Sequence, residues 1–147
     1  MEPTSGSDRS SVDLALLLVR LIGGGIIAVH GAQKLFPLFG GPKLDGLVQS
    51  QGPVGYLVAI GEFFGGLGLV LGILSRFSAA SNIVIMLGAI FLVHGKNGFF
   101  SPGGFEYNLA LIGLFLPILI AGPGRHTLAR PLPFLGHSGE PPHQAIE

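Results

Sequence analysis

The chain alternates between four long apolar runs and short polar segments. The runs cover residues 12–29, 54–74, 77–93 and 105–121. Each comes close to the ~20 apolar residues that a helix needs to cross the hydrocarbon core of a bilayer. Backbone polar groups in lipid must be satisfied within their own segment, so these runs are expected to be helices. The pattern predicts an all-α, four-transmembrane-helix bundle.

A His-Gly pair with polar neighbours follows the first and the third run. The two copies are His30-Gly31-Ala32-Gln33-Lys34-Leu35-Phe36 and His94-Gly95-Lys96-Asn97-Gly98-Phe99-Phe100. The repetition predicts two similar halves, each a helix, a His-Gly loop and a second helix. We expect residues 12–124 to form the membrane domain, between a polar N-terminal tail at 1–11 and a Pro-rich C-terminal tail at 125–147.

The composition favours a membrane protein over a soluble one. Hydrophobic residues make up 48% of the chain and charged residues only 11%, and the mean hydropathy is +0.65. The 25 glycines suit helices that approach closely in lipid. The net charge is zero and no basic stripe is present, so no nucleic-acid partner is predicted. The absence of cysteine excludes thiolate catalysis and iron–sulfur ligation by this chain alone.

Two charged side chains interrupt the apolar runs. Arg20 precedes His30 by ten residues and Glu62 follows Val54 by eight, which places them ~15 Å and ~12 Å from the same end of two antiparallel helices. An unpaired charge at the bilayer centre costs at least ~2.5 kcal/mol, so we expect Arg20 and Glu62 to pair inside the bundle. The pair is either a structural clasp that fixes helix register or part of a proton or ligand path.

A polar core layer is predicted at a similar depth. Asn82 lies within the third run and Pro117 within the fourth. Proline lacks a backbone N–H, so Pro117 leaves the carbonyl of Gly113 without its helical partner. Asn82, Gly113 and Pro117 are therefore expected to join the charged pair in one layer of the bundle.

The polar groups around the His-Gly turns form the candidate ligand site. They are His30, Gln33, Lys34, His94, Lys96, Asn97, Glu106, Tyr107 and Asn108. Gln33 and Lys34 share a face with His30 if the helix continues through Gly31. Two histidines at equivalent places in the repeat can face one another and hold a quinone oxygen, because a few convergent donors in an apolar lining suit such a headgroup. The alternative is a pair of interfacial histidines that bond to loop carbonyls.

Metal binding and membrane orientation follow from the remaining polar residues. Two histidines without a carboxylate or thiolate at fixed spacing are a weak signal for a metal, so no metal site is predicted. Four spans place both termini on one side, and the charges of the two sides are Arg9, Arg76, Arg125 and Arg130 against Lys34, Lys43 and Lys96. The positive-inside rule then favours cytoplasmic termini.

Several motifs agree in order with a known family. The chain shows an arginine in the first run, the His30 turn followed by Phe39-Gly40-Gly41, a glutamate in the second run, His94-Gly95, then Gly104-Phe105-Glu106-Tyr107-Asn108-Leu109, and last Gly122-Pro123-Gly124-Arg125-His126-Thr127-Leu128. Together these resemble the DoxX family of small four-helix bacterial membrane proteins, over residues 14–125. The positions that match the family pattern are Arg20, His30, Lys34, Glu62, His94 and Glu106.

The resemblance implies association with membrane redox systems. DoxX relatives include a subunit of thiosulfate:quinone oxidoreductase and a member of a mycobacterial complex with superoxide dismutase and a sulfurtransferase-like protein. The resemblance does not imply that this chain is itself the catalyst. We expect a bacterial inner-membrane subunit of a quinone-linked electron-transfer complex, with a quinone near the His-Gly turns and redox proteins as partners. The alternatives are a structural accessory subunit of a respiratory or photosynthetic complex, and a small-molecule transporter.

Overall fold

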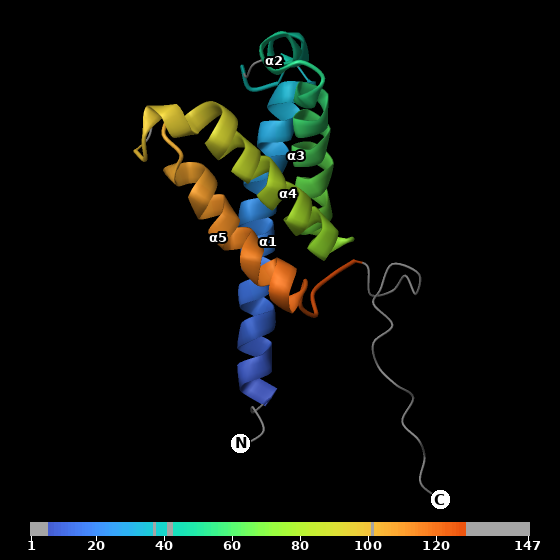
Figure 1. The fold of residues 1–147 in the computed structure, drawn as a ribbon. Coiled ribbons are helices and arrows are strands. Elements are labelled where there is room, and N and C mark those ends of the chain that lie inside the picture. Colours follow the sequence, from blue (N-terminus) through green and yellow to red (C-terminus); the bar gives the residue numbers. More distant parts are fainter. Residues whose placement is uncertain (1–5, 37, 41–42, 101, 129–147) are drawn as a thin grey trace, which may run out of the picture.

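The computed structural model describes residues 6–36, 38–40, 43–100 and 102–128 (Figure 1). Within these ranges the chain is all-helical and contains no strand, which confirms the predicted class. The helices are α1 (Gly6–Leu35), α2 (Leu44–Gln51), α3 (Val54–Leu71), α4 (Ser75–Ala89) and α5 (Glu106–Ala121), with a π-helical turn at Ile90–His94 and a 3-10 turn at Gly95–Asn97. The predicted N-terminal tail is helical from Gly6, and the rest of both predicted tails, 1–5 and 129–147, lies outside the described residues.

Three helical segments are long and apolar enough to cross a membrane. They are Gly6–Leu35, Val54–Leu71 and Ser75–Asn97. The fourth apolar segment, α5, has 16 residues and is therefore about 24 Å long. The chain is a multi-pass membrane protein, and the count of four spans stays a prediction.

Helix α1 packs along α3 through small residues. The buried positions of α1 recur every three or four residues, as expected for one face of a helix. A Cβ on Gly24 would lie 2.8 Å from the Cβ of Leu69, and a Cβ on Gly66 would lie 2.5 Å from the backbone N of Ala28. Gly31 packs directly on the backbone of Phe63. These contacts bring the two backbones close together and set the register of α1 against α3.

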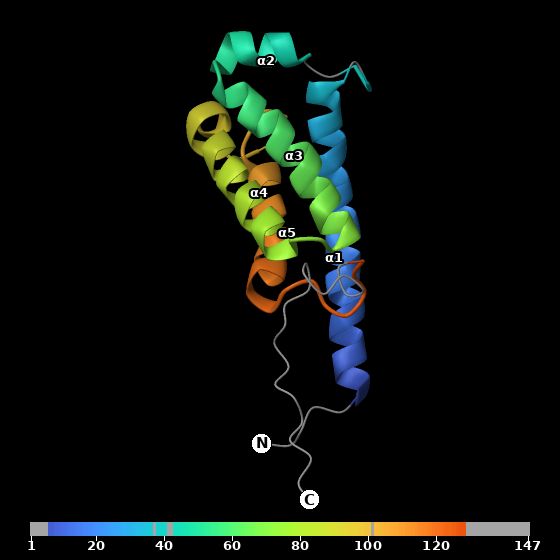
Figure 2. The ribbon, with the colours of Figure 1, turned by 90° about the vertical axis from the view of Figure 1, so that its right-hand side faces the viewer.

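Helices α4 and α5 lie side by side and cover the other flank of α1 and α3 (Figures 1 and 2). All four long helices contribute to one apolar core, which consists of Ile27, Leu69, Ala79, Met86, Leu111, Ile112, Phe115 and Ile118. The outer faces are also apolar: Phe64 is 61% exposed, Phe77 71% and Phe91 79%. Large aromatic side chains on both the inside and the outside of a bundle are typical of helices that face lipid.

The chain after α5 turns back across the end of the bundle (Figures 1 and 2). We call residues 122–128 the closing segment. Arg76 of α4 donates to the carbonyl of Ile120 at 3.2 Å, and the backbone N–H of Leu128 donates to the carbonyl of Leu71 at 3.0 Å. The first bond joins α4 to the end of α5, and the second joins the closing segment to the end of α3.

Candidate functional site

Glu62 of α3 forms an ion pair with Lys34 of α1. Both side chains are largely shielded, with exposed fractions of 5% and 15%. Arg20 and Glu62 form no ion pair in the structure, so the predicted pairing is wrong. The physical reason is register: α1 continues through Gly31 to Leu35, which puts Arg20 about 22 Å from the helix end and Lys34 at the depth of Glu62.

His30 and Tyr107 lie beside this ion pair. Their ring centroids are 5.6 Å apart and the ring planes are inclined by 49°. Lys34 is one helical turn after His30 and interacts with it electrostatically, and Glu62 interacts in the same way with the Tyr107 phenol. We call His30, Lys34, Glu62 and Tyr107 the His30 cluster. It gathers polar groups from α1, α3 and α5 at one end of the bundle.

A shallow apolar groove, wide open to the outside and formed by α1 alone, lies beside His30 on the outer face of this helix. It is lined by Leu21, Ile22, Gly25, Ile26, Val29 and His30 and has a volume of about 510 Å³. Gly25 contributes to the hollow, since a Cβ built there would have no neighbour within 4 Å. His30 is the only polar side chain among these lining residues. The groove thus combines an apolar wall with one imidazole at its end, the combination expected of a site for an apolar ligand with a polar head.

The other predicted ligand residues bond elsewhere. His94 Nδ1 lies 3.0 Å from the carbonyl oxygen of Gly103, and Asn97 donates to the same oxygen at 3.0 Å. Gln33 donates to the carbonyl of Phe39 at 3.4 Å. His94 thus bonds to a loop carbonyl and His30 contacts Tyr107, so the two histidines each have partners of their own.

The remaining candidates lie around α5 and its loop. Asn108 is buried and donates to the sulfur of Met86 at 3.4 Å. Glu106 begins α5 and is half-buried, whereas Lys96 is exposed. Of the nine polar groups predicted near the turns, His30, Lys34 and Tyr107 join the His30 cluster. Glu62 was expected deeper in the bundle, and Tyr107 was one of many polar groups near the turns, which is why spacing alone did not single them out.

The predicted polar core layer is only partly formed. Asn82 is fully buried and donates to the carbonyl of Ser78 at 2.9 Å. Gly113 and Pro117 are exposed on the outer face of α5, because Phe115 and Ile118 occupy the inner face. The assignment of Gly113 and Pro117 to the layer is therefore wrong.

Comparison with known proteins identifies the family of the chain. The DoxX family model matches residues 15–95, more than half of the chain. The chain belongs to the DoxX family. A Bacillus subtilis (strain 168) protein named "Putative oxidoreductase CatD" is 29% identical over 110 residues, which cover 75% of this chain and 82% of that protein. No solved structure matches the chain significantly.

The matched DoxX region contains most of the His30 cluster. His30, Lys34 and Glu62 fall within residues 15–95, and Tyr107 lies beyond them. Among the described residues, no group of three or more histidine, aspartate or glutamate side chains is arranged to hold a metal ion. The chemistry available at the cluster of this DoxX protein is hydrogen bonding and proton exchange by an imidazole, a phenol and an ion pair.

Arg20 lies at the other end of the DoxX bundle. Its side chain is fully buried, and its Nη2 donates to the carbonyl of His126 in the closing segment. Its Nη1 packs on Gly72, which ends α3 with a left-handed φ of 75°. Its Nε and Nη1 have no hydrogen-bond partner among the described residues.

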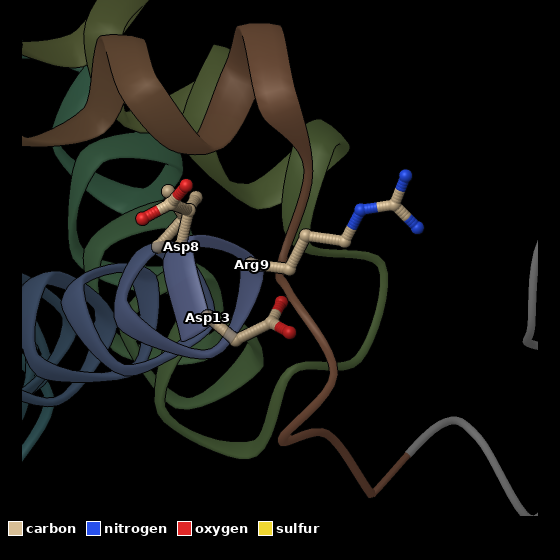
Figure 3. A pocket seen from close by; sticks show the side chains of 4 residues that line it. Asp8, Arg9 and Asp13 are labelled. Atoms are coloured by element: carbon tan, nitrogen blue, oxygen red, sulfur yellow. The ribbon is translucent and has the colours of Figure 1, made fainter. Parts of the chain in front are cut away.

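A second, smaller hollow lies at the start of α1. Asp8, Arg9, Val12 and Asp13 line it, and its volume is about 290 Å³. Figure 3 shows that Asp13 points toward the closing segment, whereas Arg9 points away from Asp13. Asp13 accepts a 3.0 Å hydrogen bond from the backbone N–H of Arg125, and its other oxygen lies 3.4 Å from Arg125 Nε. The acidic group here anchors the closing segment to α1.

Proposed function

We propose that this DoxX protein is an inner-membrane subunit of a quinone-linked electron-transfer complex and binds a quinone headgroup at the His30 cluster. The observation that carries this proposal is the contact of the half-buried His30 with the exposed Tyr107, beside a shielded ion pair and at the end of an apolar groove. The Bacillus subtilis relative is named "Putative oxidoreductase CatD", and this name supports a redox role.

The side chains of the cluster suit the two ends of such a ligand. The His30 imidazole and the Tyr107 hydroxyl are hydrogen-bond donors that match quinone carbonyl oxygens. The groove along Leu21, Ile22 and Ile26 is apolar and faces outward, where an isoprenoid tail enters from lipid. Reduction of a quinone to a quinol takes up two electrons and two protons. A partner redox protein would supply the electrons, and His30 and Tyr107 would pass the protons.

The same proposal includes the membrane arrangement. We infer that α5 is the fourth span, so that α1 with α3 and α4 with α5 form two helix pairs related by the repeated His-Gly signature. The start of α1, the α3–α4 turn and the closing segment then lie together on the side of the termini. By sequence, four arginines (Arg9, Arg76, Arg125 and Arg130) belong to that side and three lysines to the other, so the positive-inside rule favours the cytoplasm for the termini.

Quinone binding by histidine variants tests the headgroup site. The purified protein in detergent is titrated with a short-chain quinone, and bound quinone is measured after equilibrium dialysis. His30→Leu removes one donor, worth about 1 to 1.5 kcal/mol, so the Kd should rise about tenfold. His94→Leu is the matched control, because His94 bonds to Gly103, and its Kd should stay within about twofold of wild type. Equal Kd values for all three proteins would reject the site.

A pair of glycine variants tests the groove separately. Gly25→Leu fills the groove, and Gly113→Leu adds the same side chain on the outer face of α5; a Cβ at either position has no neighbour within 4 Å. With a long-tailed quinone, Gly25→Leu should weaken binding several-fold and Gly113→Leu should not. Equal binding by the two variants would place the tail elsewhere.

A structural accessory subunit is the second candidate. The observation that favours it is that Lys34 and Glu62 satisfy one another within the chain. An accessory subunit copurifies with its complex in a fixed ratio and releases no quinone on extraction, so quantitative mass spectrometry of the extracted complex separates the two proposals. The transporter alternative depended on an Arg20–Glu62 path, which this structure does not form.

A further inference from the structure

No carboxylate among the described residues forms an ion pair with Arg20. Its side chain is 0% exposed, and its Nε and Nη1 have no partner among the described residues. Lys34 pairs with Glu62 and Arg125 with Asp13, so these two carboxylates have other partners. A buried cation without a partner is strongly unfavourable, whereas a fully hydrogen-bonded anion beside it offsets the cost. The two unpartnered nitrogens of the guanidinium therefore require acceptors.

More unpartnered donors border the same α3–α4 turn. Arg20 Nη1 lies against Gly72, and α4 begins three residues later at Ser75. The hydroxyl of Ser75 is buried and has no partner among the described residues. The N-terminus of α4 has no side-chain cap, and its first helical hydrogen bond is that of Ser78 N–H to the carbonyl of Leu74. The N–H groups before it are the free donors with which helix N-termini bind anions.

The turn lies at the depth where headgroups are expected. It joins the ends of two apolar helices that are long enough to span a membrane. Leu71, Leu74 and Phe77 around it are exposed, so apolar side chains surround the donors on the outer surface. Phosphate groups lie at the level where such helices end.

We propose that Arg20, Ser75 and the N-terminus of α4 bind an oxyanion of the phosphate type, either free phosphate or the phosphodiester of an anionic lipid. Guanidinium groups, hydroxyls and helix N-termini are the donors that such anions prefer. The closing segment covers the site: Thr127 packs on Gly72, and His126 accepts from Arg20. This site is separate from the His30 cluster and does not depend on quinone binding.

Thermal unfolding of the full chain in detergent tests the proposal. Three additions are compared with detergent alone: phosphatidylglycerol, a galactolipid with the same acyl chains but no phosphate, and inorganic phosphate matched in ionic strength by chloride. A rise in Tm with phosphatidylglycerol alone identifies a lipid phosphodiester, and a rise with inorganic phosphate identifies the free anion. No phosphate-specific rise in either form overturns the site.

A serine variant separates binding from folding. Ser75→Ala removes a hydroxyl that has no partner in the described structure, so without added anion it should melt like wild type. With the stabilising anion, its apparent Kd should rise about tenfold, as expected for the loss of one charge-assisted hydrogen bond. Ser50→Ala is the control, because Ser50 bonds to Leu47 on α2, and its Kd should be unchanged. Equal anion stabilisation of Ser75→Ala and wild type would reject the assignment.

Discussion

The two ends of this DoxX bundle hold buried charge in different ways. At one end Lys34 and Glu62 balance one another across α1 and α3. At the other end Arg20 is buried with one backbone carbonyl as its acceptor. Arg20 and the Lys34–Glu62 pair both lie where α1 packs on α3. The polarity of the neighbouring helices therefore does not explain why only one of the two sites contains an ion pair. The register of α1 against α3 decides which charge meets an opposite charge.

The largest effect on stability is expected from breaking the ion pair between Lys34 and Glu62. Lys34→Met leaves the Glu62 carboxylate buried without a partner, which should lower the free energy of unfolding by about 3 to 5 kcal/mol. The double variant Lys34→Met with Glu62→Gln removes both charges and should recover most of the loss. Unfolding in mixed micelles with rising denaturing detergent measures the difference.

The control for this prediction is a lysine of the second half. Lys96 is exposed in the loop after α4, so Lys96→Met should change the free energy of unfolding by no more than about 0.5 kcal/mol. If Lys34→Met and Lys96→Met unfold alike, the ion pair does not stabilise the bundle.

A smaller effect on stability is expected from disturbing the close contact that sets the register of α1 against α3. A Cβ on Gly31 would overlap the backbone of Phe63, whereas a Cβ on Gly25 would meet nothing. Gly31→Ala should therefore lower the free energy of unfolding by about 1 to 3 kcal/mol, the usual range for overpacking a tight interface. Gly25→Ala should not lower it. Thermal unfolding of both variants in one detergent compares them. A Gly31→Ala protein as stable as Gly25→Ala would mean that the close helix contact does not set the register.

The apolar pattern was sufficient to predict the helices but not their register. All four apolar runs are helical, as expected from their lengths. The first helix continues six residues beyond its predicted end, to Leu35, because Gly31 is held in the helix by its contact with Phe63. Because of this extension, Arg20 lies farther from the end of α1 than predicted. Lys34, and not Arg20, therefore pairs with Glu62. Spacing along one helix cannot reveal a register that a glycine contact with another helix determines.

The repeated His-Gly signature also produces two different local structures. His30-Gly31 lies inside α1, whereas His94 ends a π-helical turn and Gly95 begins a 3-10 turn. The first copy packs on α3 and contributes to a polar cluster. The second bonds to its own loop through Gly103. The two copies differ because α3 packs on Gly31. The repeated sequence therefore predicted where the two histidines lie along their helices, but not which groups they contact.

The smallest effect concerns the ion pair at the closing segment. Arg125 is 62% exposed in its pair with Asp13, so water and salt screen the attraction, and Asp13→Asn should cost only about 0.2 to 1 kcal/mol. At 1 M salt the Debye length falls to about 3 Å, and the difference between Asp13→Asn and wild type should become smaller. The shielded Lys34–Glu62 pair should keep its contribution at the same salt concentration. Thermal unfolding of Asp13→Asn and Lys34→Met at low and high salt measures both. Equal salt dependence of the two variants would show that the Lys34–Glu62 end is as open to water as the closing segment, which would contradict the shielding on which the contrast between the two ends depends.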